Sequence, residues 1–328
     1  MPNLNSTQNI FIGGTGRSGT TILSKTLNQL DDIYTIPQEI RFITDPDGLI
    51  SLEHSLVSDW SKFHSDLAME RFLNLMENLK TRYKGRYPNH GISEIITDHF
   101  YQSWVTEFSN YFISYKIKDG WAARVNLLNK TLLNVFGKNS FTELFLEHSY
   151  YCKPHSINAF LEISGNFVQD FFNQVRLLNN AKIIVEHTPS NLIHSDFILK
   201  MVPNSKLIHI YRDPRDVLCS YKVQDWGSSH LENNIEWLND IFYQWSLKKE
   251  SLKPNQFMEI AFEELIFSYD ATIEKISDYL GINSNGVLPK INLSKHNIGR
   301  WKTELNEKEK IISNNKLKNI INDYGYNL

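Results

Sequence analysis

Residues 10–21 read IFIGGTGRSGTT, and this stretch decides how the rest of the chain folds. Its first three residues are apolar and predict a buried strand, which ends where a glycine-rich loop begins. A helix is expected over Gly19 to Leu30, where leucines recur at helical spacing. The first N–H groups of that helix and the positive end of its dipole would face the loop, which predicts an anion site.

Gly14 and Gly19 have the spacing of a P-loop, but Thr20 stands where loops that use ATP or GTP carry a lysine. Arg17 offers a planar guanidinium to oxyanions. The loop also supplies hydroxyl donors, with no evident carboxylate partner for Mg²⁺, from Ser18, Thr20 and Thr21. We therefore expect a ligand that binds without metal. Glycine turns between a strand and a helix are also common for structural reasons alone. A second site is therefore needed to decide whether this loop binds a ligand.

The second site is the segment 206–225, KLIHIYRDPRDVLCSYKVQD. A buried strand is expected to end at Arg212, and Asp213 with Pro214 has the pattern of a helix start. Arg212 at the strand end and Ser220 two turns into the helix can converge on one phosphate beside the first loop.

GTGRSGTT and YRDPRDVLCSY together resemble the 5′-phosphosulfate loop and the 3′-phosphate motif of sulfotransferases that use 3′-phosphoadenosine 5′-phosphosulfate (PAPS). The resemblance implies that PAPS is the co-substrate and adenosine 3′,5′-bisphosphate the product. It assigns donor binding to Gly16, Arg17, Ser18, Gly19, Thr20, Thr21, Arg212 and Ser220. Arg17 would also be catalytic, because its charge can stabilise the transferring group.

Glu39-Ile40-Arg41 resembles a Glu-x-Arg that supplies the catalytic base in the tyrosylprotein branch of the family and in bacterial relatives. The resemblance makes Glu39 the base and Arg41 a substrate-binding residue. The alternative is a surface ion pair at a strand end, which is common in α/β proteins.

His187 follows the apolar strand predicted over 182–186, at the end of the strand where α/β folds bind ligands. Similar sulfotransferases carry Lys-Thr-Pro here, so His187 departs from the pattern and the role of that lysine is open. His187 could act as acid, base or neutral hydrogen-bond donor, or it could be only a satisfied polar group.

Two later segments extend the resemblance. Phe262-Glu263-Glu264-Leu265 is similar to the family's Tyr-Glu-Asp-Leu, which implies that Phe262 contacts adenine by stacking, because it has no hydroxyl. Gly299-Arg300-Trp301-Lys302 resembles the family's cofactor loop near the end of the chain, called here the late loop. The alternative is that its basic residues are simply solvated, as such residues usually are in a loop. Between the second site and these segments, a helix over 236–252 is expected to present Trp237, Ile241 and Trp245 on one face.

These patterns predict one α/β domain over residues 1–328, with a P-loop-like, mostly parallel central sheet flanked by helices. Residues 44–180 are expected to form a mostly helical insertion over the acceptor site. Its aromatic stretch is more typical of core than of a pocket, for Phe108, Tyr111, Phe112 and Tyr115 alike.

Composition and charge argue against some partners and locations for this chain. The chain has 328 residues, a formal charge of −3 and 41% hydrophobic residues, without a run long enough to span a membrane. Nucleic acid is not an expected partner, and the polar N-terminus lacks a signal-peptide pattern, so a cytoplasmic location is expected. Cys152 and Cys219 receive no function.

The predicted reaction is sulfuryl transfer to a hydroxyl or amine of a small molecule, a carbohydrate or a tyrosyl peptide. The sequence does not choose among these acceptors, and it does not give the oligomeric state. The alternatives are a non-catalytic module that binds a nucleotide or phosphate ester, and a small-molecule kinase, which the missing lysine at Thr20 opposes.

Overall fold

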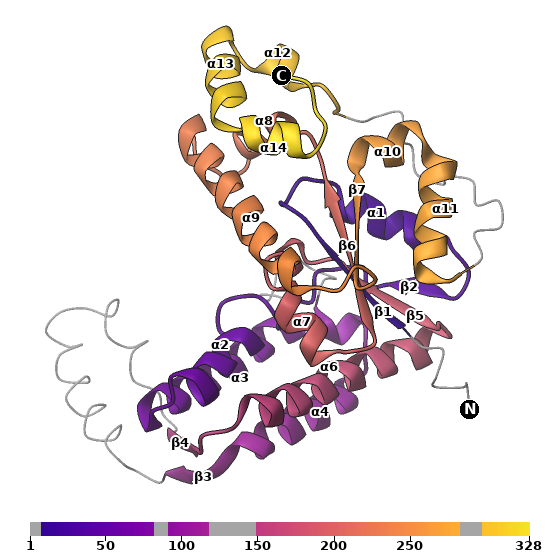
Figure 1. The fold of residues 1–328 in the computed structure, drawn as a ribbon. Coiled ribbons are helices and arrows are strands. Elements are labelled where there is room, and N and C mark those ends of the chain that lie inside the picture. The colour runs from indigo at the N-terminus through magenta and orange to yellow at the C-terminus, as the bar shows by residue number, and fades with distance from the viewer. Residues whose placement is uncertain (1–7, 82–90, 118–148, 283–296) are drawn as a thin grey trace, which may run out of the picture. The chain divides into compact units, whose positions relative to one another are not determined.

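The structure, a computed structural model, describes residues 8–81, 91–117, 149–282 and 297–328 (Figure 1). The chain forms two compact units. Residues 1–39 and 175–328 make up the first, called here the α/β unit, and residues 40–174 make up the second, the helical unit. The long helix α6 (Ile157–Asn179) begins in the helical unit and ends in the α/β unit.

The α/β unit is built on a five-stranded sheet in the order β2-β5-β1-β6-β7 (Figure 1). Every pairing in it is parallel, which confirms the expected central sheet. The strands are β1 (Gln8–Gly13), β2 (Ile33–Thr35), β5 (Ile183–Glu186), β6 (Ser205–Tyr211) and β7 (Phe257–Ala261). Because β5 and β6 both pair with β1, the carboxyl ends of these three strands lie side by side.

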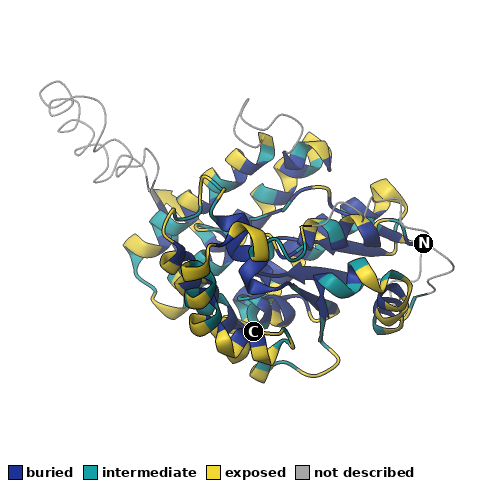
Figure 2. Cartoon of the chain, turned by 90° about the horizontal axis from the view of Figure 1, so that it is seen from above, coloured by how far each residue is buried: buried dark blue, intermediate teal, exposed yellow. Residues whose placement is uncertain are grey.

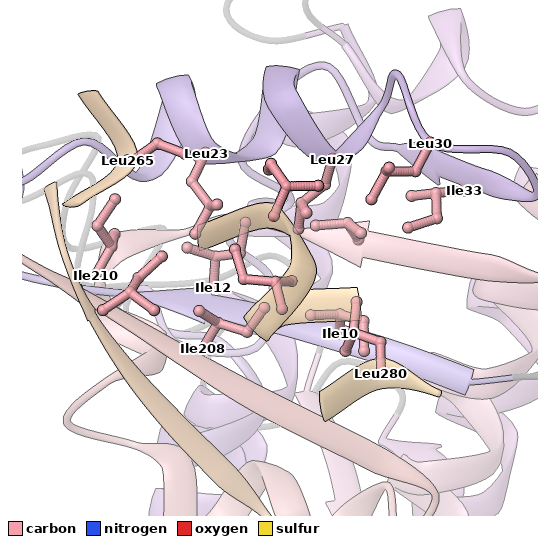
Figure 3. Close-up of a cluster of buried hydrophobic side chains, with 14 of the residues drawn as sticks. Ile10, Ile12, Leu23, Leu27, Leu30, Ile33, Ile208, Ile210, Leu265 and Leu280 are labelled. Atoms are coloured by element: carbon pink, nitrogen blue, oxygen red, sulfur yellow. The ribbon is translucent and has the colours of Figure 1, made fainter. Parts of the chain in front are cut away.

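Side chains alternate between the two faces of this sheet, as in any strand. Ile10 and Ile12 of β1 pack with leucines of α1 and with helices α10 and α11 in a buried cluster (Figure 3). On the opposite face, the fully buried His209 of β6 lies against Trp245 of α9, with ring centroids 5.2 Å apart. The strands are accordingly dark blue in Figure 2, while the outer faces of the helices are yellow.

The helices of the α/β unit are α1 (Thr20–Leu27), α7 (Ser195–Met201), α8 (Pro214–Tyr221), α9 (Leu231–Ser251), α10 (Phe262–Phe267), α11 (Tyr269–Leu280), α12 (Trp301–Glu304), α13 (Glu307–Lys316) and α14 (Lys318–Asp323). The structure has helices where the sequence predicts them: α1 begins as expected and ends three residues early, α8 begins at Pro214, and α9 begins five residues before the predicted start. Asp213 caps α8 by accepting a hydrogen bond from the N–H of Arg215. Gly281 ends α11 with φ of 71°, a left-handed conformation suited to glycine.

The residues predicted to share one face of α9 differ in burial. Trp237 is 42% exposed, whereas the buried stripe of the helix passes through Leu238, Phe242 and Trp245. The tryptophan spacing suggested a shared face, but the buried face is rotated by one residue toward Leu238. Trp237 is therefore available on the surface.

The helical unit has an aromatic core. Trp104 stacks on Phe167 at 4.0 Å between ring centroids, and its Nε1 donates to the Phe167 carbonyl at 2.8 Å. Its elements are α2 (Leu49–Glu53), a π-helical turn (His54–Ser58), α3 (Lys62–Thr81), a 3₁₀ turn (Ile92–Glu94), α4 (Asp98–Phe112), β3 (Ile113–Ile117), β4 (Ser149–Cys152) and most of α6. The antiparallel pair β3–β4 was not predicted. Phe108 and Phe112 are buried as expected, but Tyr111 and Tyr115 are exposed.

Among the described helices, none combines the length and apolarity needed to cross a bilayer.

Candidate active site

The glycine-rich loop joins β1 to α1 and is packed too tightly for side chains at its key glycines. A Cβ on Gly14 would lie 2.3 Å from the Ser18 hydroxyl and 2.7 Å from the carbonyl of Ile210 on β6. Gly19 has φ of 112°, and a Cβ there would lie 2.5 Å from the Phe262 ring. Only glycine fits either position, so the loop is pressed against β6 and α10.

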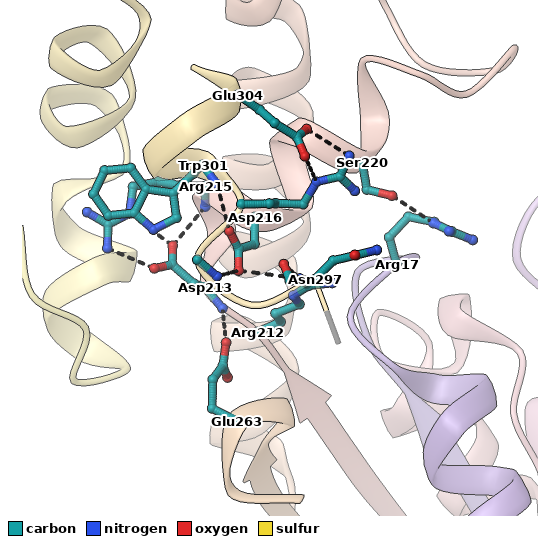
Figure 4. A network of polar contacts seen from close by, with 12 residues as sticks. Arg17, Arg212, Asp213, Arg215, Asp216, Ser220, Glu263, Asn297, Trp301 and Glu304 are labelled. Carbon is teal, nitrogen blue, oxygen red and sulfur yellow. Dashed lines mark hydrogen bonds and ion pairs between the residues drawn. The ribbon is translucent and has the colours of Figure 1, made fainter. Parts of the chain in front are cut away.

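Arg17 projects from this loop with φ of 67°, a left-handed conformation that is uncommon for a residue with a side chain. Its Nε donates to the Ser220 hydroxyl of α8 at 2.9 Å (Figure 4). Arg17 itself is exposed, while Ser220 is buried. The structure thus brings together the two motifs that the sequence placed at distant points of the chain.

Ser18 follows Arg17 in the loop and is fully buried. Its hydroxyl has no hydrogen-bond partner among the described residues. A buried hydroxyl without a partner is costly, so a ligand oxygen in the loop would satisfy it.

Thr20 is buried and Thr21 is exposed at the start of α1. The N–H groups of Ile22 and Leu23 donate to the Gly19 carbonyl at 3.0 and 2.9 Å, so the helix start leaves the N–H groups of Thr20 and Thr21 for a ligand. These groups fit a phosphate or sulfate oxyanion.

Arg212 follows β6 and is nearly buried, at 7% exposure. Its Nη2 lies 3.3 Å from Asp216 Oδ2 and also donates to the carbonyl of Asn297 (Figure 4). The Arg212 Nε has no hydrogen-bond partner in the described part of the chain. One guanidinium N–H is therefore left for a ligand, next to the α8 helix that carries Ser220.

Asp216 ties the second motif to the late loop. It accepts hydrogen bonds from the N–H groups of Gly299 at 2.7 Å and Trp301 at 3.0 Å. Burial raises the pKa of Asp216, against the lowering effect of these two N–H groups and of Arg212. The late loop is therefore held beside Arg212, which its predicted role in donor binding requires.

The late-loop side chains are engaged within the protein. Arg300 pairs with Glu304 through two hydrogen bonds of 2.9 and 2.8 Å, and the half-buried Trp301 stacks under the Arg215 guanidinium at 3.9 Å. Lys302 is exposed. Donor binding by Arg300, Trp301 and Lys302 stays a prediction.

Phe262, the residue expected to stack on adenine, is 3% exposed. Its ring belongs to the buried cluster, contacts the loop at Gly19 and has the Arg212 guanidinium 5.1 Å from its centroid. The adenine contact stays a prediction, and in this conformation Phe262 supports Gly19 and Arg212.

His187 comes directly after β5 and is 4% exposed, with an Nδ1 that has no partner among the described residues. The next segment is anchored to the loop, because the N–H of Gly14 donates to the Pro189 carbonyl at 3.1 Å. His187 therefore sits at the carboxyl end of the strand that pairs with β1, as predicted.

Glu186 is a residue that the sequence analysis missed. Its carboxylate is 1% exposed and accepts hydrogen bonds from the N–H of Thr188 at 2.9 Å, from the Thr188 hydroxyl and from Asn191. Asn191 also donates to the Ile12 carbonyl of β1 at 3.1 Å. Glu186 thereby fixes the His187–Asn191 turn against the loop. A carboxylate at the end of an otherwise apolar strand was the signal that could have found it.

Glu39 and Arg41 follow β2, which pairs with β5. Glu39 is half-buried and is the last residue of the N-terminal segment, 1–39, of the α/β unit. Arg41 belongs to the helical unit, where its Nε lies 3.5 Å from Asp45 Oδ2. The roles of base and substrate contact stay predictions.

Comparisons with known proteins give the relatives of this chain. A sulfotransferase 2A6 from Mus musculus is 28% identical over 119 residues, which cover 31% of this chain and 39% of the mouse protein. The chain thus matches less than half of the length of that relative.

Two solved structures share the fold over nearly the whole chain. A sulfotransferase domain from the curacin biosynthetic pathway matches with a TM-score of 0.50 at 14% identity, covering 97% of this chain and 98% of that one. A sulfotransferase domain from the Synechococcus PCC 7002 olefin synthase matches with a TM-score of 0.50 at 13% identity, covering 100% and 98%. The family model described as "Sulfotransferase family" matches residues 9–285, and the chain therefore belongs to the sulfotransferase family.

Proposed function

We propose that this protein transfers the sulfuryl group of PAPS to a hydroxyl or amine of an acceptor. The observation that carries the proposal is the hydrogen bond from Arg17 to Ser220, which joins the glycine-rich loop to the second anion-binding motif. A donor with a 5′-phosphosulfate and a 3′-phosphate needs two such anion sites next to each other. The Ser18 hydroxyl and the Arg212 Nε, which have no partner among the described residues, support the same ligand.

In the proposed reaction, an acceptor oxygen attacks sulfur while the bond from sulfur to the 5′-phosphate oxygen breaks. Arg17 and the N–H groups at the start of α1 stabilise charge on the oxygens of the transferring and leaving groups. Glu39 takes the acceptor proton, and His187 hydrogen-bonds the oxygen that leaves. The products are the sulfated acceptor and adenosine 3′,5′-bisphosphate.

The rival proposals are a small-molecule kinase and a binding module without chemistry. Thr20 in place of a lysine opposes the kinase. Glu186 is the carboxylate at the end of the strand beside β1, but its oxygens accept hydrogen bonds from Thr188 and Asn191, which also opposes a role as Mg²⁺ partner.

Thermal melting tests the donor class, because a ligand that binds only the folded state raises the melting temperature. Adenosine 3′,5′-bisphosphate should raise it without added metal, whereas ATP with Mg²⁺ should have a much smaller effect. A larger effect of ATP with Mg²⁺ would favour the kinase. Turnover of labelled PAPS with an acceptor then separates an enzyme from a binding module.

We also propose that residues 1–328 form one sulfotransferase domain with a helical insertion over 44–180, and that this domain acts without metal. A cytoplasmic location of the protein is part of the same proposal, and cell fractionation tests it.

A further inference from the structure

Two exposed tryptophans lie in the α/β unit close to the glycine-rich loop. Trp226, in the turn between α8 and α9, is 51% exposed, and Trp237 on α9 is 42% exposed. A methyl group placed on Gly16 would lie 4.0 Å from Cη2 of Trp226 and 3.9 Å from the Tyr221 hydroxyl. The edge of the Trp226 indole therefore lies beside the residue that precedes Arg17.

Trp226, Trp237 and the buried Tyr221 form one cluster, which we call the aromatic wall. The Trp226 and Trp237 rings meet at 5.5 Å and 81°, and the Trp226 and Tyr221 rings meet at 5.0 Å and 73°. The Tyr221 hydroxyl donates to the Thr15 carbonyl at 3.3 Å. Tyr221 thus fixes the aromatic wall to the glycine-rich loop, and the two tryptophans present its exposed part.

The turn that carries Trp226 is tightly hydrogen-bonded. The N–H of Gln224 donates to the Tyr221 carbonyl at 3.1 Å, and the N–H of Gly227 donates to the Gln224 carbonyl at 3.0 Å. A Cβ on Gly227 would lie 2.1 Å from the Tyr221 carbonyl oxygen, so only glycine fits there. The backbone therefore holds Trp226 in place. Adjacent large apolar side chains that are held in solvent are typical of a binding surface.

We propose that Trp226 and Trp237 bind the acceptor, and that the acceptor is a hydroxylated aromatic ring such as a phenol. This inference rests on the proposed function, because it places the acceptor oxygen next to the sulfuryl group at Arg17. Nearly perpendicular indoles offer one ring face and one ring edge, which a flat aromatic ring can meet by stacking and edge-to-face contact. A sugar can place its C–H face on one indole, but it has no aromatic ring for the edge-to-face contact with the other.

Binding of 2-naphthol in the presence of saturating adenosine 3′,5′-bisphosphate tests the inference without requiring turnover. The test variant is Trp226→Ala, and its matched control is Tyr243→Ala, which removes another exposed aromatic side chain from the same region, on α9. We expect Trp226→Ala to weaken 2-naphthol binding about tenfold and to leave bisphosphate affinity within about twofold. Tyr243→Ala should change neither affinity.

The outcomes separate the inference from the proposed function. If the wild type binds the bisphosphate but Trp226→Ala binds 2-naphthol as well as wild type does, the acceptor site lies elsewhere. A loss of bisphosphate affinity in Trp226→Ala would instead assign the indole to the adenine of the donor. Binding of N-acetylglucosamine but not 2-naphthol would overturn the aromatic class. Failure of the wild type to bind the bisphosphate at all would reject the proposed function itself.

Discussion

Arg17 Nε lies 2.9 Å from Ser220 Oγ, although the two residues are 203 positions apart in the chain. The hydrogen bond holds an exposed guanidinium of the glycine-rich loop against α8, where we propose that the 3′-phosphate binds. Ser220→Ala removes the hydroxyl without opening a large cavity. We expect adenosine 3′,5′-bisphosphate to bind about tenfold more weakly, as one hydrogen bond to a charged group is lost. Calorimetric titration measures this change.

The control for Ser220→Ala is Ser229→Ala, in the exposed turn that follows α8. It should bind the bisphosphate as wild type does. Equal affinities for the wild type and Ser220→Ala would show that Ser220 does not contact the nucleotide.

Metal should not be needed for binding or turnover. The expectation rests on Thr20 in place of the P-loop lysine and on the hydrogen bonds that occupy Glu186. Treatment with EDTA should leave the bisphosphate affinity and the rate of transfer from labelled PAPS unchanged. If EDTA abolishes activity and Mg²⁺ restores it, the protein is better explained as a small-molecule kinase.

Glu39→Gln tests the proposed base, using any acceptor that a screen with labelled PAPS finds. Since the carboxylate acts only as the proton leaves, kcat should fall by about 10² to 10⁴ with little change in bisphosphate affinity. His187→Ala should be milder, and His187→Lys should retain activity. If Glu39→Gln turns over normally and His187→Lys is inactive, His187 is the base.

Acid should weaken the α/β unit through Glu259. Burial alone would raise the pKa of this carboxyl group, but hydrogen bonds from His209, Lys249 and Trp245 outweigh burial and hold it at about 2. In the unfolded chain the pKa returns to about 4.3. Because the folded pKa is the lower one, the contribution of the ionised carboxylate is complete above about pH 5 and is lost as the pH falls toward 2.

Urea unfolding of the wild type and of Glu259→Gln at several pH values measures that contribution. The difference in free energy of unfolding should be largest near pH 7 and should shrink by pH 3. Glu236→Gln, at an exposed position on α9, should show no such trend. A difference that stays constant between pH 7 and pH 3 would rule out the ionised carboxylate as the cause.

The strands and helices around the loop could be predicted from local patterns. The apolar run at Ile10, the leucines of α1 and the Asp-Pro start of α8 each reflect short-range physics, and the structure confirms them. The expected neighbourhood of Arg17 and Ser220 followed from the resemblance, which implies that the two motifs bind one ligand.

Contacts made by tertiary packing could not be predicted. Nothing local indicates that the Trp301 ring lies against the Arg215 guanidinium or that Phe262 is buried against Gly19. The helical spacing of Trp237 and Trp245 predicted a shared face, but it did not show that the buried face of α9 passes through Leu238 and leaves Trp237 exposed. The aromatic wall was missed for the same reason, since its rings meet only in the folded chain.

Titration of adenosine 3′,5′-bisphosphate and of adenosine 5′-monophosphate into the wild type and Arg212→Ala tests the central claim most directly. The wild type should bind the bisphosphate more tightly. Arg212→Ala should cost the bisphosphate about 1.5 to 3 kcal/mol, a loss of about 10- to 150-fold, because it removes a charge-assisted contact to the 3′-phosphate. Its affinity for the monophosphate should stay within about twofold, which also shows that the variant folds. Equal losses for both ligands, or no preference of the wild type for the bisphosphate, would contradict the account.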